Sequence, residues 1–114
     1  MNTLENNKLI AEFMGWGYYF TDNDTEAFER IPNELYTVDE LEFHTSWDWL
    51  MPVVEKIEEN EDIDVNILLN GTRIFKWRTN EDIVNNVANI SFDKKIEHTY
   101  KAVVEFIKWY NENK

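Results

Sequence analysis

The stretch HTSWDWLMPVVEKI, residues 44–57, places a histidine and two tryptophans at the start of one amphipathic segment. Leu50, Val54 and Ile57 follow at the i, i+4, i+7 spacing, which predicts a helix with a single apolar face. Each tryptophan offers on the order of 200 Å² of buriable surface. The fold therefore depends on what this central helix packs against.

The sequence leaves two positions open for the start of the central helix. Thr45 is predicted to be its N-cap, and Asp48 follows three residues later, where a carboxylate meets free backbone N–H groups and the positive end of the helix dipole. Pro52 lies beyond the first turn of a helix that begins at Ser46, and there it removes a backbone hydrogen bond. Either the helix kinks at Pro52 or its regular part begins near Leu50.

The composition is that of one folded domain over residues 1–114. An apolar fraction of 43% with five tryptophans excludes intrinsic disorder. The chain has no cysteine, which excludes disulfides and thiolate metal sites. No apolar run approaches the roughly 18 residues of a membrane span, and the N-terminus lacks a basic and apolar leader. We therefore expect a cytoplasmic protein without membrane contacts.

Negative charge is concentrated in the middle of the chain. Residues 22–64 hold 15 Asp or Glu against only Arg30 and Lys56, a net charge of −13, whereas the rest of the chain carries +1. Direct binding to nucleic acid or to anionic lipid needs clustered Lys and Arg, so we expect this chain to bind neither. A basic partner would instead be attracted to the acidic segment.

The first 45 residues predict one helix followed by extended and irregular chain. Residues 4–14 have helical apolar spacing, with Gly15 as the stop. A turn then leads into an aromatic strand that ends at Phe20, and a second strand is expected around residues 35–38. Leu41 and Phe43 are predicted to anchor an irregular loop to the core.

The second half of the chain predicts a hairpin and a long helix. Residues 64–77 flank Asn70-Gly71, a dipeptide typical of a type I′ turn, and pairing about it sets Ile67 opposite Ile74 on the core face. Residues 80–91 fit either a helix or an edge strand. Residues 93–112 predict a long helix with Asp93 as its N-cap. The fold class is therefore α+β, a layered domain with a small, mainly antiparallel sheet.

Three blocks of the sequence carry a resemblance to a known family. They are NKLIAEFMG at 7–15, FHTSWDWLMPVVEKI at 43–57 and KIEHTYKAVVEFIKWYN at 95–111. In these blocks the chain resembles the phage ABA sandwich domain proteins, small proteins of phages and bacterial genomes, often of gut Bacteroidetes. The resemblance implies a three-layer α/β/α sandwich, a phage or prophage origin in a bacterial host cell, and no established activity, so it assigns no catalytic residue.

The polar residues do not predict a catalytic, cofactor or metal site. His44 lies near Glu42 and Asp48, as a general base with an orienting carboxylate would, but we favour hydrogen bonds at the helix start for His44 and a capping role for Asp48. His98 is the second of only two histidines. The Ca²⁺-loop pattern at 22–26 is incomplete, because the later ligand positions hold Arg30 and an isoleucine.

Most of the aromatic residues are expected in the core, and any that stay exposed would mark a contact surface. The residues in question are Trp16, Tyr18, Tyr19, Phe20, Trp47, Trp49, Trp77, Trp109 and Tyr110. The favoured function is accordingly a non-catalytic protein-interaction module whose partner is a basic host or phage protein. A sharper version is an inhibitor that imitates DNA phosphates on a nucleic-acid-binding enzyme.

A small-molecule module is the second hypothesis. It would bind a nucleotide-like anion through Arg73, Lys76 and Arg78, the clustered cations of the hairpin. Homo-oligomerisation through the acidic segment and the slightly basic C-terminal part stays open.

Overall fold

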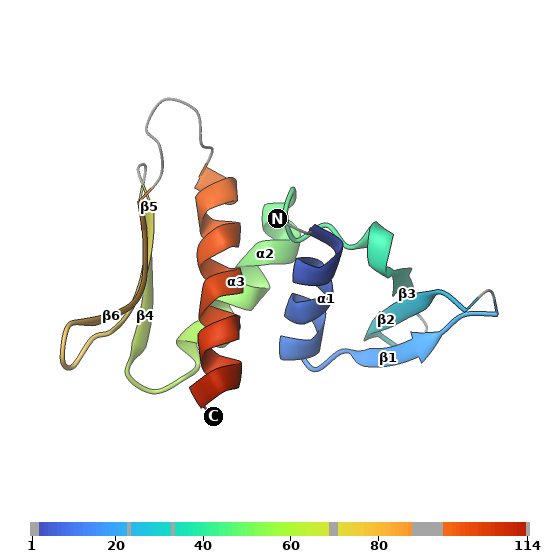
Figure 1. Ribbon diagram of the computed structural model, residues 1–114, viewed down its shortest axis with the longest axis horizontal. Helices are drawn as coiled ribbons and strands as arrows, with labels where there is room; N and C mark the ends of the chain where they lie inside the picture. The colour runs from blue at the N-terminus through green and yellow to red at the C-terminus, as the bar shows by residue number, and fades with distance from the viewer. Residues whose placement is uncertain (1–2, 23, 33, 69–70, 88–94, 114) are drawn as a thin grey trace.

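The computed structural model describes residues 3–22, 24–32, 34–68, 71–87 and 95–113 (Figure 1). The helices are α1 (Thr3–Phe13), the short 3₁₀ helix η1 (Val38–Glu40), α2 (Trp47–Glu58) and α3 (Lys95–Asn113). The strands are β1 (Gly17–Phe20), β2 (Glu26–Ile31), β3 (Glu34–Thr37), β4 (Ile63–Leu68), β5 (Gly71–Lys76) and β6 (Glu81–Val87).

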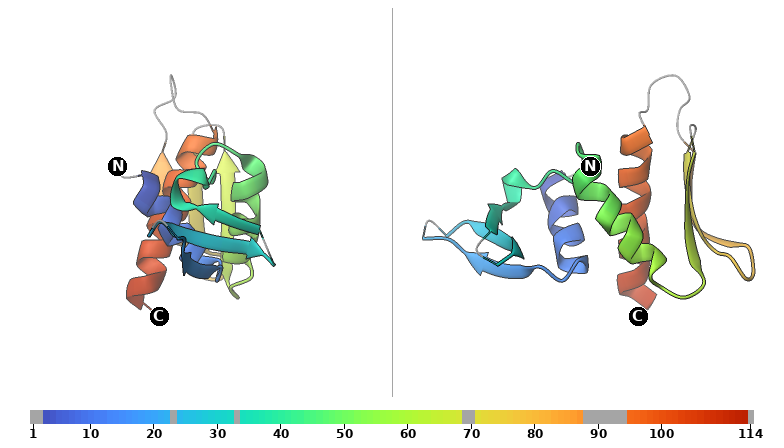
Figure 2. Two further views of the ribbon diagram at one scale, coloured as in Figure 1. Left: turned by 90° about the vertical axis from the view of Figure 1, so that its right-hand side faces the viewer. Right: turned by 180° about the vertical axis from the view of Figure 1, so that it is seen from behind.

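The strands form two separate antiparallel sheets. Sheet A has the order β1-β2-β3 and sheet B the order β4-β5-β6. Figures 1 and 2 show the three α-helices between the sheets, with α3 against sheet B and α1 nearest sheet A. The α+β class is confirmed, whereas the single sheet expected from the sequence is two sheets. The helices therefore cover one face of sheet A and one face of sheet B, and they do not enclose a single sheet from both sides.

One cluster of buried side chains joins both sheets to the helices. It includes Phe28 from sheet A, Ile74 from sheet B and Phe106 from α3, all fully buried. Leu41 and Phe43 are also buried, which confirms their predicted role as anchors. The apolar faces of the helices are thus largely used within the protein.

The central helix begins at Trp47, one residue after the start that Thr45 as N-cap would give and three residues before Leu50. Its N-cap is Ser46, in extended conformation with φ −127°, and not Thr45. Pro52 lies inside the helix, so the start near Leu50 is wrong. The fully buried side chains of Leu50, Val53 and Ile57 hold this segment in the core and offset the hydrogen bond that proline removes.

The end of α1 is as predicted. Gly15 has φ +77°, a conformation that favours glycine, and its N–H donates to the carbonyl of Glu12 at 3.0 Å. The N–H of Trp16 donates to the carbonyl of Ala11 at 3.2 Å, which completes a Schellman motif. This turn directs the chain from α1 into β1.

The β4–β5 hairpin has the predicted core face in a different register. Ile67 lies opposite Thr72, and Val65 lies opposite Ile74. The predicted pairing of Ile67 with Ile74 is wrong by two residues, a shift that leaves every side chain on the same face. The turn residues 69–70 lie outside the described residues, and Gly71 already pairs with Leu68 in the ladder.

Residues 80–91, for which the sequence left helix or strand open, contain the strand β6 (Glu81–Val87). β6 pairs with β5, and Val84 is buried against the core. Residues 88–91 and the predicted cap Asp93 lie outside the described residues. The long C-terminal helix is confirmed as α3, in which Tyr100, Val103 and Ile107 are buried on one face.

Candidate functional site

His44 belongs to a hydrogen-bond network centred on the buried side chain of Asn7. Asn7 of α1 is 1% exposed, and its Nδ2 donates to the carbonyl of Leu41 at 3.1 Å and lies 3.1 Å from His44 Nδ1. The Tyr100 hydroxyl of α3 donates to Asn7 Oδ1 at 2.9 Å. This network fastens the loop before α2 to both α1 and α3.

Glu42 and Asp48 are the two carboxylates near His44 in the sequence. Glu42 and Asp48 are exposed, and the hydrogen bond described for the His44 ring is to Asn7. Asp48 lies in the first turn of α2, where its charge meets the positive end of the helix dipole.

Tyr100 makes the network sensitive to high pH. Burial raises the pKa of Tyr100 to about 12, above the value near 10 of an unfolded tyrosine. The free energy of unfolding should not depend on this group below pH 10, and should fall by about 2–3 kcal/mol as the pH rises toward 12. Urea unfolding at pH 9 and pH 11.5 should show a smaller alkaline loss for Tyr100→Phe than for the parent chain. An equal loss in both would contradict this assignment.

A second buried polar cluster, which the sequence analysis missed, joins sheet B to α3. Thr72 Oγ1 lies 2.6 Å from His98 Nδ1 and 3.0 Å from Thr99 Oγ1. All three residues are buried. Thr72 lies more than 20 residues before His98 and Thr99 in the chain, which explains why spacing alone did not reveal the cluster.

The edge of sheet A presents three consecutive exposed aromatic residues. Tyr18, Tyr19 and Phe20 of β1 are 44%, 47% and 63% exposed. Among the described strands, β1 pairs only with β2 and so lies at one edge of sheet A. The Thr21 N–H donates to the Thr25 carbonyl at 2.9 Å in the same register. Because hydrogen-bonded pairs alternate in an antiparallel ladder, the backbone N–H and C=O groups of Tyr18 and Phe20 face the open edge.

An ion pair fixes the inner side of this edge against α1. Glu26 Oε1 accepts hydrogen bonds from Lys8 Nζ at 2.9 Å and from the Tyr18 hydroxyl at 2.8 Å. The bond from Lys8 lowers the pKa of Glu26, and the carboxylate in turn raises the pKa of both Lys8 and Tyr18. Tyr18 is thus held in one orientation although it is partly exposed.

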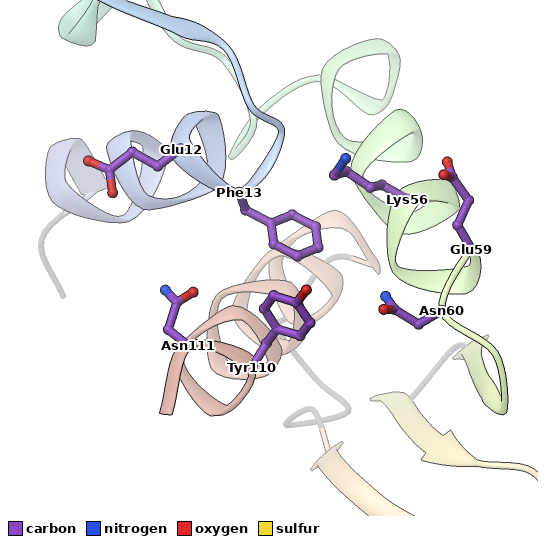
Figure 3. Close-up of a pocket in the computed structure, with 7 residues that line it drawn as sticks. All are labelled: Glu12, Phe13, Lys56, Glu59, Asn60, Tyr110 and Asn111. Carbon is purple, nitrogen blue, oxygen red and sulfur yellow. The ribbon is translucent and has the colours of Figure 1, made fainter. Parts of the chain in front are cut away.

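A cavity of about 570 Å³ lies where the three α-helices end, and we call it the helix-end cavity (Figure 3). The rings of Phe13 and Tyr110 meet edge to face, 5.6 Å between centroids, and Lys56 Nζ lies 5.9 Å from the Phe13 centroid. The lining residues are Glu12, Phe13, Lys56, Glu59, Asn60, Tyr110 and Asn111. The sequence did not reveal this site, because it depends on the relative direction of three helices.

A further cavity of about 500 Å³ lies between α1, the start of β2 and η1. Leu4 and Val38 contribute apolar surface to it, and the Lys8–Glu26 ion pair lies in its wall. Glu5 and Asp39 also line this cavity, so its lining holds three carboxylates against the single ammonium of Lys8.

The three cations predicted to bind a nucleotide-like anion do not line either cavity. Arg73 pairs with Asp82 and thereby lowers the pKa of that carboxyl. The Arg78 Nε lies 2.6 Å from an oxygen of Asp62, and Lys76 Nζ lies 5.8 Å from the Trp109 ring centroid. Each cation therefore already has a partner within the chain.

Two further properties follow from the described part of the chain. No three His, Asp or Glu side chains within residues 3–22, 24–32, 34–68, 71–87 and 95–113 gather in a way that could hold a metal ion. None of the helices in the same ranges is both long and apolar enough to cross a membrane.

Comparisons with protein-family models, with curated proteins and with solved structures found no match to this chain. The resemblance to the phage ABA sandwich domain proteins therefore stays a prediction.

Proposed function

We propose that this chain is a non-catalytic protein-interaction module that binds a basic, extended segment of a partner protein along β1. The observation that carries the proposal is an edge strand with all four residues exposed, three of them aromatic. An open edge offers backbone hydrogen bonds to an added strand, and exposed tyrosine and phenylalanine supply apolar contacts. β1 contains no lysine or proline, the residues that usually block such pairing.

The charge of the surrounding chain specifies the partner. β1 runs directly into the acidic segment 22–64, and Asp22 and Asp24 lie exposed in the loop that joins it to β2. A second copy of this chain would bring like charges together, whereas a lysine- or arginine-rich segment would be attracted. We therefore expect the partner strand to alternate apolar and basic residues.

Selection from a random dodecapeptide library tests the proposal. The enriched peptides are expected to alternate apolar residues with Lys or Arg, and their affinity to fall with rising salt. Phe20→Pro removes an N–H that faces the open edge without removing a ladder bond, and it should weaken binding at least about tenfold. Phe20→Ala, which keeps that N–H, is the matched control and should weaken binding less.

Two results would contradict the proposal. One is a library that yields no enriched sequence, and the other is an enriched peptide that binds the parent chain and Phe20→Pro equally well. Thermal unfolding of both variants checks that they are folded.

A further inference from the structure

The three α-helices run toward the same side of the protein, so their C-terminal ends surround one cavity. Figure 1 shows α1, α2 and α3 all descending toward that side. Phe13 is the last residue of α1, Asn60 follows the end of α2, and Tyr110 lies in the last turn of α3. All three residues line the helix-end cavity (Figure 3).

This arrangement makes the helix-end cavity electronegative. Each helix C-terminus carries about half a negative charge. The last turns of α1 and α3 contain no basic residue that would offset this charge. Glu12 and Glu59 add two carboxylates to the rim, against the single ammonium of Lys56. The site therefore favours a cation.

Lys56 indicates which kind of cation fits. Its Nζ lies 5.9 Å from the centroid of the Phe13 ring, within the range of a cation–π contact. The chain thus places its own alkylammonium group beside the aromatic pair Phe13 and Tyr110. The amide groups of Asn60 and Asn111 and the Tyr110 hydroxyl add hydrogen-bonding groups to the lining.

We propose that the helix-end cavity binds an alkylammonium group from outside the chain, and that Lys56 competes with it for the same place. The volume of about 570 Å³ is within the range of small-molecule sites. The ammonium can belong to a free diamine or to a lysine side chain of another protein. This site is independent of β1 and of the partner proposed for it.

Calorimetric titration of the full chain with 1,4-diaminobutane and with Nα-acetyl-lysine amide tests the proposal and separates the two sources. Tighter binding of the diamine indicates a free ligand, and tighter binding of the lysine derivative indicates a protein side chain. Lys56→Gln removes the internal competitor and should strengthen binding about threefold to tenfold. Phe13→Leu should weaken it by a similar factor.

Lys76→Gln is the matched control for the charge change. Lys76 also lies over an aromatic ring, that of Trp109 at 5.8 Å, but it does not line the cavity. This control should leave the affinity within about twofold of the parent value, since distant surface charges are screened by salt. Three results would overturn the proposal: no binding of either amine to the parent chain and Lys56→Gln, equal strengthening by both lysine variants, or weaker amine binding in Lys56→Gln.

Discussion

Replacement of Trp49 by alanine is expected to lower the free energy of unfolding by about 3–5 kcal/mol, as measured by urea denaturation. Trp49 is 8% exposed, and its ring lies 5.9 Å from that of Trp16 and 5.4 Å from that of Phe43. It also contacts sheet A, with 4.9 Å to the Tyr36 centroid and 4.9 Å to the Arg30 guanidinium carbon. The substitution would thus leave a cavity between α2 and sheet A.

Trp47→Ala is the matched control, since the same side chain is removed two residues away. Trp47 is 37% exposed. Its loss should cost about 1–2 kcal/mol, less than the loss of Trp49, because more than a third of its surface stays in water. Equal losses for the two variants would show that Trp49 does not join the sheet to the helix.

Replacement of Asn7 by alanine is expected to cost about 3–4 kcal/mol of unfolding free energy in the same assay. The Leu41 carbonyl, the His44 ring nitrogen and the Tyr100 hydroxyl would all lose their bonds to the Asn7 side chain. Each buried polar group left without a partner costs about 1–3 kcal/mol, and relaxation or entering water reduces the total.

Asn6→Ala provides the comparison for Asn7→Ala. Asn6 precedes Asn7 in the same helix and is 6% exposed, but its Nδ2 lacks a hydrogen-bond partner within the described ranges. Alanine there should change stability by less than about 1 kcal/mol, since little bonding is lost and alanine favours a helix. A larger loss for Asn6→Ala than for Asn7→Ala would contradict the network.

The elements that could be predicted from the sequence are those whose pattern repeats along one face. The long helix α3 followed from apolar residues at helical spacing, and the stop of α1 followed from Gly15. β2 was missed because its sequence, EAFERI, buries Ala27 and Phe28 in succession and lacks a clear alternation. Without β2, the aromatic strand and the strand near residue 35 could not be recognised as one sheet.

The sequence predicted the kind of contact surface, acidic and aromatic, but not where on the protein it lies. The acidic middle of the chain follows from composition. The expectation that only a minority of the nine aromatic residues would be exposed is wrong, because five of them are: Tyr18, Tyr19, Phe20, Trp47 and Trp77. Composition also does not say which strand lies at an edge. The helix-end cavity brings together Phe13, Lys56 and Tyr110, which are more than 40 residues apart in sequence at each step. They come together because the three helices end on the same side of the protein (Figure 1).

Backbone hydrogen exchange at β1, followed by NMR, tests the central claim most directly. In the free chain, the amides of Tyr18 and Phe20 should exchange faster than that of Tyr19, whose N–H is paired with β2 in the alternating ladder. A basic peptide from the library selection should slow exchange at Tyr18 and Phe20 and leave Tyr19 nearly unchanged. Tyr18 and Phe20 amides that are already protected in the free chain, or that exchange at the same rate with peptide bound, would contradict an open edge that accepts a partner strand.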